Sequence, residues 1–175
     1  MYIAMELNGQ YEEALAGWKD YLTKFRDNLT APRFIERDKA LIKEREWEQA
    51  LERAGNARDP AEANAARTDA ERLHDEVLQM WQAQAGSGDE EDPYAVGRIL
   101  RMKALKLIDE KRYLEAIAVL QNAWSKSASF ADEALRMIID VKLKAGIPLS
   151  VSEKKAVMRR EEAKKYKNMP PEPGK

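Results

Sequence analysis

Apolar residues recur with a helical period along most of the chain. In the segment 113–124 they occupy positions i, i+3, i+4, i+7, i+10 and i+11, which form one stripe of an amphipathic helix. A second stripe precedes it within 96–107, and a wider third stripe follows within 131–145. Alternation with a period of two is nowhere sustained. The pattern predicts an all-α protein of antiparallel helical hairpins, with about seven or eight helices.

Helix-breaking and helix-capping residues lie between these stripes. The Thr-Ala-Pro run at 30–32 predicts a helix start, and Asp59 followed by Pro60 predicts another. Gly-Ile-Pro at 146–148 should end the third striped helix, and Ser150 or Ser152 can cap a last helix.

The clearest loop is the acidic, Gly-rich segment 86–93. Its four consecutive acids would lie favourably at the positive end of the next helix. We therefore expect N-terminal helical hairpins over 1–85, and a C-terminal hairpin with following helices over 94–168. The Pro-rich residues 169–175 are predicted to be a disordered tail.

The chain contains an internal repeat. Residues 41–51 align without a gap with residues 107–117, and both read Leu-Ile-x-Glu-basic-x-aromatic-x-polar-Ala-aliphatic. Residues 9–15 repeat the core of this pattern, and the copies are roughly one and two units of a ~34-residue repeat apart. Each copy predicts a helical hairpin whose first helix ends just before the aromatic residue. In the middle copy this turn would lie at Glu44–Arg45.

Two of these copies resemble the tetratricopeptide repeat. The pattern Gly-x-Tyr-x-x-Ala-Leu-x-x-Trp-x-x-Tyr-Leu at 9–22 is similar to that motif, as is Ala104 followed by the pattern at 113–123. Residues 32–56 carry the motif weakly, and Arg45 and Lys111 replace the usual turn glycine. The Pro that normally closes a unit is also missing. The resemblance implies a short α-solenoid, with an irregular helical bundle as the alternative.

The same resemblance implies a binding groove lined by the first helix of each hairpin. Carried over to this chain, its positions are Ile35, Lys39, Lys43, Arg98, Arg101, Leu105 and Asp109. They are mostly basic, which suits an acidic segment or a C-terminal carboxylate. The Asn residues of the carboxylate-clamp subclass are absent, and an ordinary charged helix face is the alternative.

The first hairpin begins with a helix of only about eight residues, shorter than the resemblance implies. A truncated terminal repeat exposes an apolar face. Either the chain is a fragment, or another surface covers these residues, with self-association as the simplest candidate. They are Met1, Ile3, Met5 and Leu7.

The amino-acid composition excludes several kinds of functional site. The chain of 175 residues has no Cys and one His, with 30 basic and 31 acidic residues. Disulfides, thiolate metal sites and cysteine nucleophiles are excluded, and His-based metal sites and triads nearly so. We expect no cofactor, no metal and no enzymatic activity. His74 is predicted to be a solvated helix residue, and the four Trp side chains are predicted to pack in the core.

No apolar run approaches the ~20 residues of a membrane span, and the N-terminus lacks a signal-peptide pattern. We therefore expect a cytoplasmic protein that does not enter the membrane.

The segment 153–167 is strongly basic. Its cations could neutralise phosphates of a nucleic acid, attract an acidic protein, or simply be solvated. The residues are Lys154, Lys155, Arg159, Arg160, Lys164 and Lys165. Our leading hypothesis is a non-enzymatic protein-interaction module that acts as a scaffold, adaptor or chaperone-like holder. A nucleic-acid-associated protein is the alternative, and an enzyme comes last.

Overall fold

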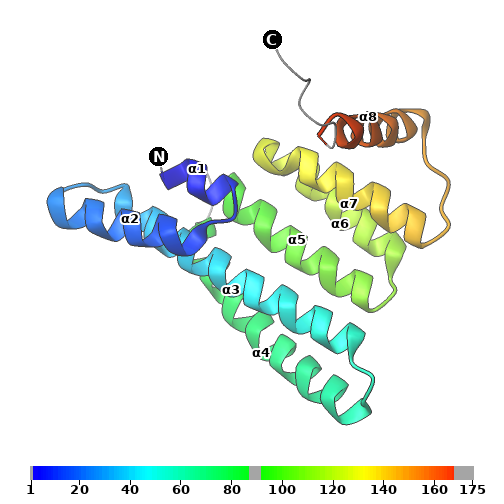
Figure 1. Cartoon of the computed structure of the whole chain (residues 1–175), viewed down its shortest axis with the longest axis horizontal. Coiled ribbons are helices and arrows are strands. Elements are labelled where there is room, and N and C mark those ends of the chain that lie inside the picture. Colours follow the sequence, from blue (N-terminus) through cyan, green and yellow to red (C-terminus); the bar gives the residue numbers. More distant parts are fainter. Residues whose placement is uncertain (1, 87–91, 168–175) are drawn as a thin grey trace, which may run out of the picture. The chain divides into compact units, whose positions relative to one another are not determined.

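The computed structural model describes residues 2–86 and 92–167, with side chains described to residue 162. This part of the chain contains eight α-helices, one short 3₁₀ turn and no strand, which confirms the predicted all-α class (Figure 1). The elements are α1 (Tyr2–Leu7), α2 (Tyr11–Lys24), α3 (Ala31–Asn56), α4 (Pro60–Ala85), α5 (Pro93–Asp109), α6 (Tyr113–Lys126), η2 (Ala128–Phe130), α7 (Ala131–Lys144) and α8 (Val151–Lys167).

The chain forms two compact units, residues 1–102 and 103–175. The division lies within α5, whereas the sequence suggested the loop 86–93. Most of that loop, residues 87–91, lies outside the described residues, as does the predicted tail 169–175.

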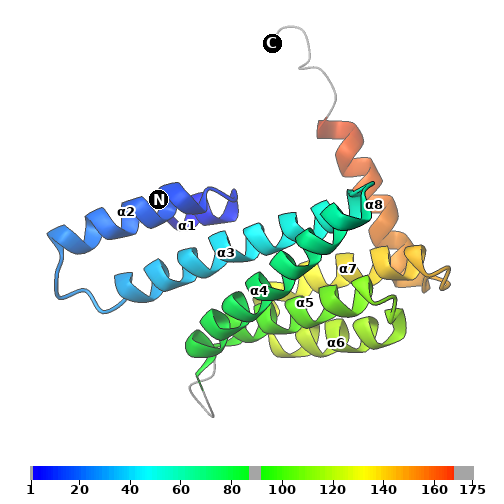
Figure 2. The ribbon, with the colours of Figure 1, turned by 90° about the horizontal axis from the view of Figure 1, so that it is seen from below.

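In the first unit, each helix packs on the next. α1 lies on α2, α2 on α3, and α3 on α4 (Figures 1 and 2). The core is built from small and aromatic side chains, and Trp47 and Trp81 are 1% and 0% exposed. α1 approaches α2 closely because residue 17 is glycine. A Cβ atom there would come within 2.2 Å of the Tyr2 ring.

The two outer copies of the repeat have the predicted turns between their helices. Gly9 has φ +75° and Lys111 has φ +60°. The next N–H in each copy donates to the carbonyl five residues earlier, from Gln10 to Met5 at 2.9 Å and from Arg112 to Leu107 at 2.8 Å. Both turns are therefore Schellman motifs with the same hydrogen bonds.

The middle copy does not form a hairpin, and the predicted turn at Glu44–Arg45 is wrong. α3 runs unbroken for 26 residues through this point. Every residue from 41 to 51 except Ile42 and Trp47 is among the better helix formers, and neither Gly nor Pro interrupts the segment. The repeat skeleton marks a pattern of buried positions here, not a turn.

In the second unit, α6 and α7 pack together, with α8 against α7. Ala116, Ile117, Leu120 and Ala123 of α6 are buried, but Trp124 is 46% exposed. The prediction that all four Trp side chains lie in the core is therefore right for Trp47 and Trp81 and wrong for Trp124, and Trp18 is half-buried. Trp124 lies at the last turn of α6, beyond the buried Ala123.

Capping residues set several helix ends as predicted. Asp59 accepts from the Ala61 N–H at the start of α4 (3.2 Å), and Asp92 accepts from the Tyr94 N–H at the start of α5 (3.0 Å). At the start of α8, the Ser150 N–H donates to Glu153 at 2.7 Å, and the Glu153 N–H donates back to the Ser150 hydroxyl. This reciprocal pair is a capping box.

Candidate binding groove and the buried acids near it

An open groove lies among α2, α3 and α4 in the first unit. It encloses about 810 Å³. Its lining is largely apolar, with Leu15 from α2, Ile42 from α3, and Met80 and Ala83 from α4. The remaining lining residues are polar: Glu36, Lys39, Lys43, Glu76, Gln79 and Gln84.

The charged residues at the groove are paired with neighbours on their own helices. Lys39 Nζ lies 2.6 Å from Glu36 Oε1, and Lys43 Nζ lies 2.6 Å from Glu46 Oε2. Both pairs are about half exposed, and exposed pairs one helical turn apart contribute little to stability. A carboxylate from a partner can therefore replace the present ones at small cost.

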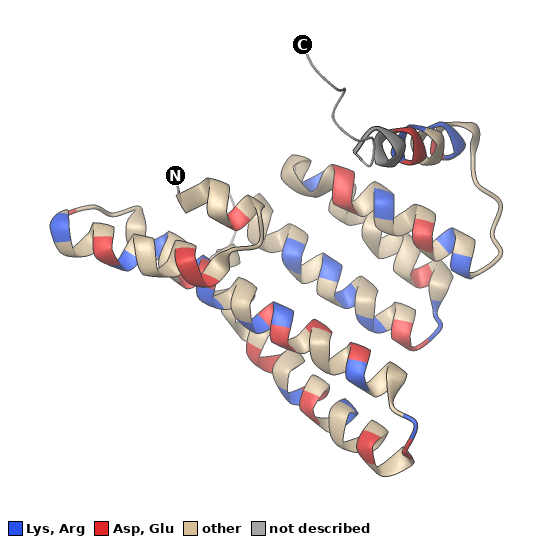
Figure 3. Ribbon diagram, viewed as in Figure 1, with Lys and Arg blue, Asp and Glu red and all other residues tan. Residues whose placement is uncertain are grey.

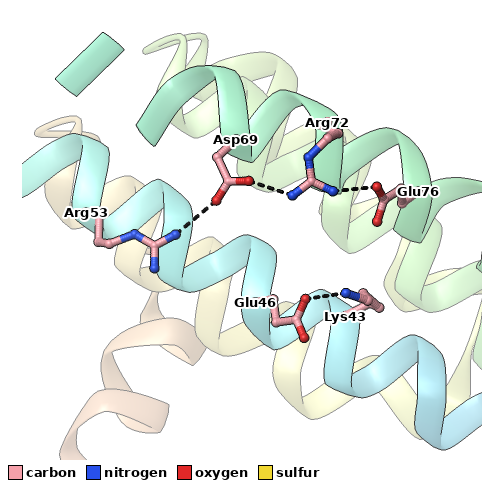
Figure 4. Close-up of polar contacts among 6 residues, drawn as sticks. All are labelled: Lys43, Glu46, Arg53, Asp69, Arg72 and Glu76. Carbon is pink, nitrogen blue, oxygen red and sulfur yellow. Dashed lines mark hydrogen bonds and ion pairs between the residues drawn. The ribbon is translucent and has the colours of Figure 1, made fainter. Parts of the chain in front are cut away.

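A chain of exposed ion pairs runs from α3 to α4 beside the groove. Arg53 of α3 reaches Asp69 of α4 at 3.1 Å, and Asp69, Arg72 and Glu76 continue the chain along α4 (Figure 4). Figure 4 also shows Lys43 and Glu46 of α3, which pair with each other. Glu76 and Lys43 both line the groove.

Only two of the predicted groove residues line this groove. They are Lys39 and Lys43. Ile35 is 8% exposed and belongs to the core. Leu105 and Asp109 lie in the second unit, half-buried and exposed respectively.

Arg98 and Arg101 lie on α5 and bind a buried carboxylate of their own chain. Glu44, 1% exposed, accepts from Arg98 Nη2 at 2.8 Å and from Arg101 Nη1 at 2.7 Å. Trp81 Nε1 donates to the same carboxylate at 3.0 Å. A buried carboxylate needs hydrogen-bond donors, and two of those around Glu44 of α3 come from α5. These arginines therefore hold α5 to α3.

Sequence reasoning missed the apolar residues of the groove. Met80 and Ala83 follow Glu76 at i+4 and i+7, beside the buried stripe of α4. These positions form a partial second apolar stripe on α4, and this stripe is the sequence signal that could have revealed the groove. Ile42 lies within the repeat pattern. Because a turn was predicted there, its place on the surface of an unbroken helix was not recognised.

A second buried carboxyl group, Asp38, lies on α3. It is 0% exposed, and neither of its oxygens has a hydrogen-bond donor in the described part of the chain. Burial first, and then the nearby charge of Glu6, raise the pKa of Asp38 to about 7 against the opposing charge of Arg37. Glu6 itself accepts from Trp18 Nε1 at 3.2 Å and from Arg37.

Part of the predicted basic surface is described. Lys154, Lys155 and Arg159 on α8 are exposed, and Arg160 Nη1 lies 3.3 Å from Asp140 Oδ1 of α7. The charges of α8 are drawn in Figure 3. The side chains of Lys164 and Lys165 lie outside the described residues.

The other predicted residues are His74 and the apolar residues at the N-terminus. The His74 side chain is only 14% exposed and its ring lies 5.5 Å from that of Trp47, so it is not the solvated histidine predicted. Ile3 and Leu7 are 49% and 83% exposed, and Met5 is half-buried. Met1 lies outside the described residues.

Across 2–86 and 92–162, no three acidic or His side chains are placed to hold a metal ion. In the same part of the chain, none of the helices combines the length and apolarity of a membrane span.

Comparison with known proteins finds no match, whether with family models, curated proteins or solved structures. The resemblance to the tetratricopeptide repeat therefore stays a prediction that rests on the residues at 9–22 and 104–123.

Proposed function

We propose that this protein is a non-enzymatic interaction module that binds a segment of a partner protein in the groove among α2, α3 and α4. The observation that carries this is the apolar lining of an open groove, with Leu15, Ile42 and Met80 brought together from three helices. Grooves between helices commonly accept an amphipathic helix or peptide with spaced apolar anchors.

An acidic segment would reach the two lysines of the rim, while Glu36 and Glu76 of the same lining are paired with Lys39 and Arg72. Lys39 and Lys43 lie one turn apart on α3 and are the cations of the lining. Their present partners, Glu36 and Glu46, are exposed residues of the same helix. The preferred ligand is therefore a peptide with two or three apolar anchors and carboxylates spaced to reach both lysines.

A display experiment tests this proposal without knowledge of the natural partner. A random peptide library is selected on the full chain, and the recovered peptides are then measured for binding to wild type and to a Met80→Arg variant that fills the groove with a charged side chain. We expect the recovered peptides to combine apolar and acidic residues and to bind wild type only. Peptides that bind both proteins equally would place recognition elsewhere.

One observation supports a nucleic acid as the second candidate ligand. Lys154, Lys155 and Arg159 share the exposed side of α8. A labelled single-stranded oligonucleotide would then bind with an affinity that falls steeply with salt, and charge reversal of these three residues would abolish binding. Affinity that is flat with salt, or unchanged by charge reversal, would exclude this ligand.

A further inference from the structure

The buried carboxyl groups of Asp38 and Glu6 join two helices. Glu6 lies on α1, with a side chain only 8% exposed, and Asp38 lies on α3 with no exposure at all. Arg37, next to Asp38 on α3, is bound to Glu6, and the charge of Glu6 acts on Asp38, so the pairing open to Asp38 is a hydrogen bond from its protonated form to Glu6. Such a bond between two acids exists only while they share a proton.

The charges at this site do not balance when both acids are ionised. Arg37 is the cation beside them and is already bound to Glu6. Trp18 Nε1 from α2 donates to the same Glu6 carboxylate. Asp38 is left with no donor, and a buried carboxylate without one is costly.

We propose that α1 is a pH-dependent latch, held on α2 and α3 while Asp38 and Glu6 share a proton and loosened when both are charged. α1 is short, with 6 residues, and none of its residues is fully buried. The contacts of α1 include the Tyr2 ring over Gly17 and Trp18, and the Glu6 carboxylate bound by Trp18 and Arg37. A change of charge at Glu6 and Asp38 therefore acts directly on α1.

The direction of the pH dependence of α1 docking follows from the pKa of Asp38 in the undocked and docked states. Its ordinary pKa is 3.8, and the docked state raises this pKa to about 7. The contribution of Asp38 to docking is therefore fully present below about pH 4, weakens as the pH rises toward 7, and is lost above 7.

The other polar and charged groups around the site do not supply this transition. Arg37 lies over the Phe34 ring and 5.4 Å from the centre of the Tyr94 ring of α5. Burial raises the pKa of Tyr94, so this group stays neutral across the range. Arg98 and Glu44 act on Tyr94 from beyond it, as does Tyr11 of α2, and Trp18 carries no charge.

The test follows the Trp18 indole N–H and the Gly17 amide by ¹H–¹⁵N NMR from pH 5 to 8.5. Trp18 donates to Glu6, and the Tyr2 ring covers Gly17, so both signals report α1 directly. We expect both to shift together toward the undocked state as the pH rises from 5 to about 7, with little further change above 7. The docking equilibrium should weaken at least about tenfold over the range.

Variants separate the latch from other titrations. Asp38→Asn keeps a donor for Glu6 at every pH, so the transition should disappear. Glu6→Gln removes the second charge, so the midpoint should fall, and this variant serves if Asp38→Asn does not fold. Glu12→Gln alters an exposed acid of α2 paired with Arg45, and it should leave the transition unchanged.

Two results would overturn the latch. One is constant Trp18 and Gly17 signals across the range in wild type. The other is an unchanged midpoint in both Asp38→Asn and Glu6→Gln. Neither result bears on peptide binding in the groove, which is measured with a separate ligand.

Discussion

At the residue scale, the left-handed turn positions of the two outer repeat copies make a matched pair. Gly9 and Lys111 adopt the same conformation in equivalent Schellman turns, but only one of them is glycine. A non-glycine residue with this φ is strained by about 1 kcal/mol.

Exchange at these two positions should therefore have opposite effects. We predict that Lys111→Gly raises the free energy of unfolding by about 0.5–1 kcal/mol, and that Gly9→Ala lowers it by about 1 kcal/mol. Urea denaturation measures both. As a control, Lys106→Gly within α5 should lower it, because glycine destabilises a helix interior. A destabilised Lys111→Gly variant would contradict the turn geometry.

The buried Glu44 should dominate the stability of the first unit. Glu44→Ala leaves Arg98, Arg101 and Trp81 without their shared acceptor, and we predict a loss of about 3 kcal/mol in the free energy of unfolding. The matched control is Glu48→Ala, since Glu48 pairs with Arg101 but is 40% exposed. Its cost should stay below about 1 kcal/mol. Equal costs for the two variants would show that Glu44 is not specially placed.

At the element scale, one buried acid links α8 to α7. Glu153 is 8% exposed; it completes the capping box with Ser150 and lies 2.7 Å from Lys142 Nζ of α7. Burial alone would raise the pKa of Glu153, but the hydrogen bonds from Lys142 and Ser150 outweigh it, so this pKa is lowered. A lowered pKa means that Glu153 stabilises α8 above about pH 4.5 and that this contribution is lost as the pH falls through the lower value.

The expected result concerns α8 alone. Glu153→Gln removes the charge from both contacts, and losing a cap costs about 1 kcal/mol. We predict faster amide hydrogen exchange in α8, with α3 and α4 unchanged. Glu162→Gln, on the exposed side of α8, is the control. Identical exchange in wild type and Glu153→Gln would contradict this role.

Helix ends were predictable from sequence where a local residue sets them. Asp59, Ser150 and Gly146 act through their own side chains or backbone conformation, so their signal does not depend on distant contacts. The turn at Glu44–Arg45 was wrongly predicted because a repeat pattern records which positions are buried. It does not record whether the backbone turns between them.

At the scale of the whole molecule, the fold class was predictable but most of the groove was not. Helical periodicity reports which face of each helix is buried, and that is enough for an all-α protein. A groove depends on which helices become neighbours, and Leu15, Ile42 and Met80 come from three of them. Arg98 and Arg101 were assigned to a groove because the sequence could not show that Glu44 lies between them and the core.

The most direct test of the proposed function is the affinity of a display-selected peptide for three proteins, measured by fluorescence anisotropy. Ala83→Arg places a charged side chain in the groove, and Ala65→Arg makes the same change at an exposed site about 27 Å away along α4. We predict at least about tenfold weaker binding by Ala83→Arg, with Ala65→Arg equal to wild type. Equal affinity for all three proteins would contradict the assignment of the groove as the binding site.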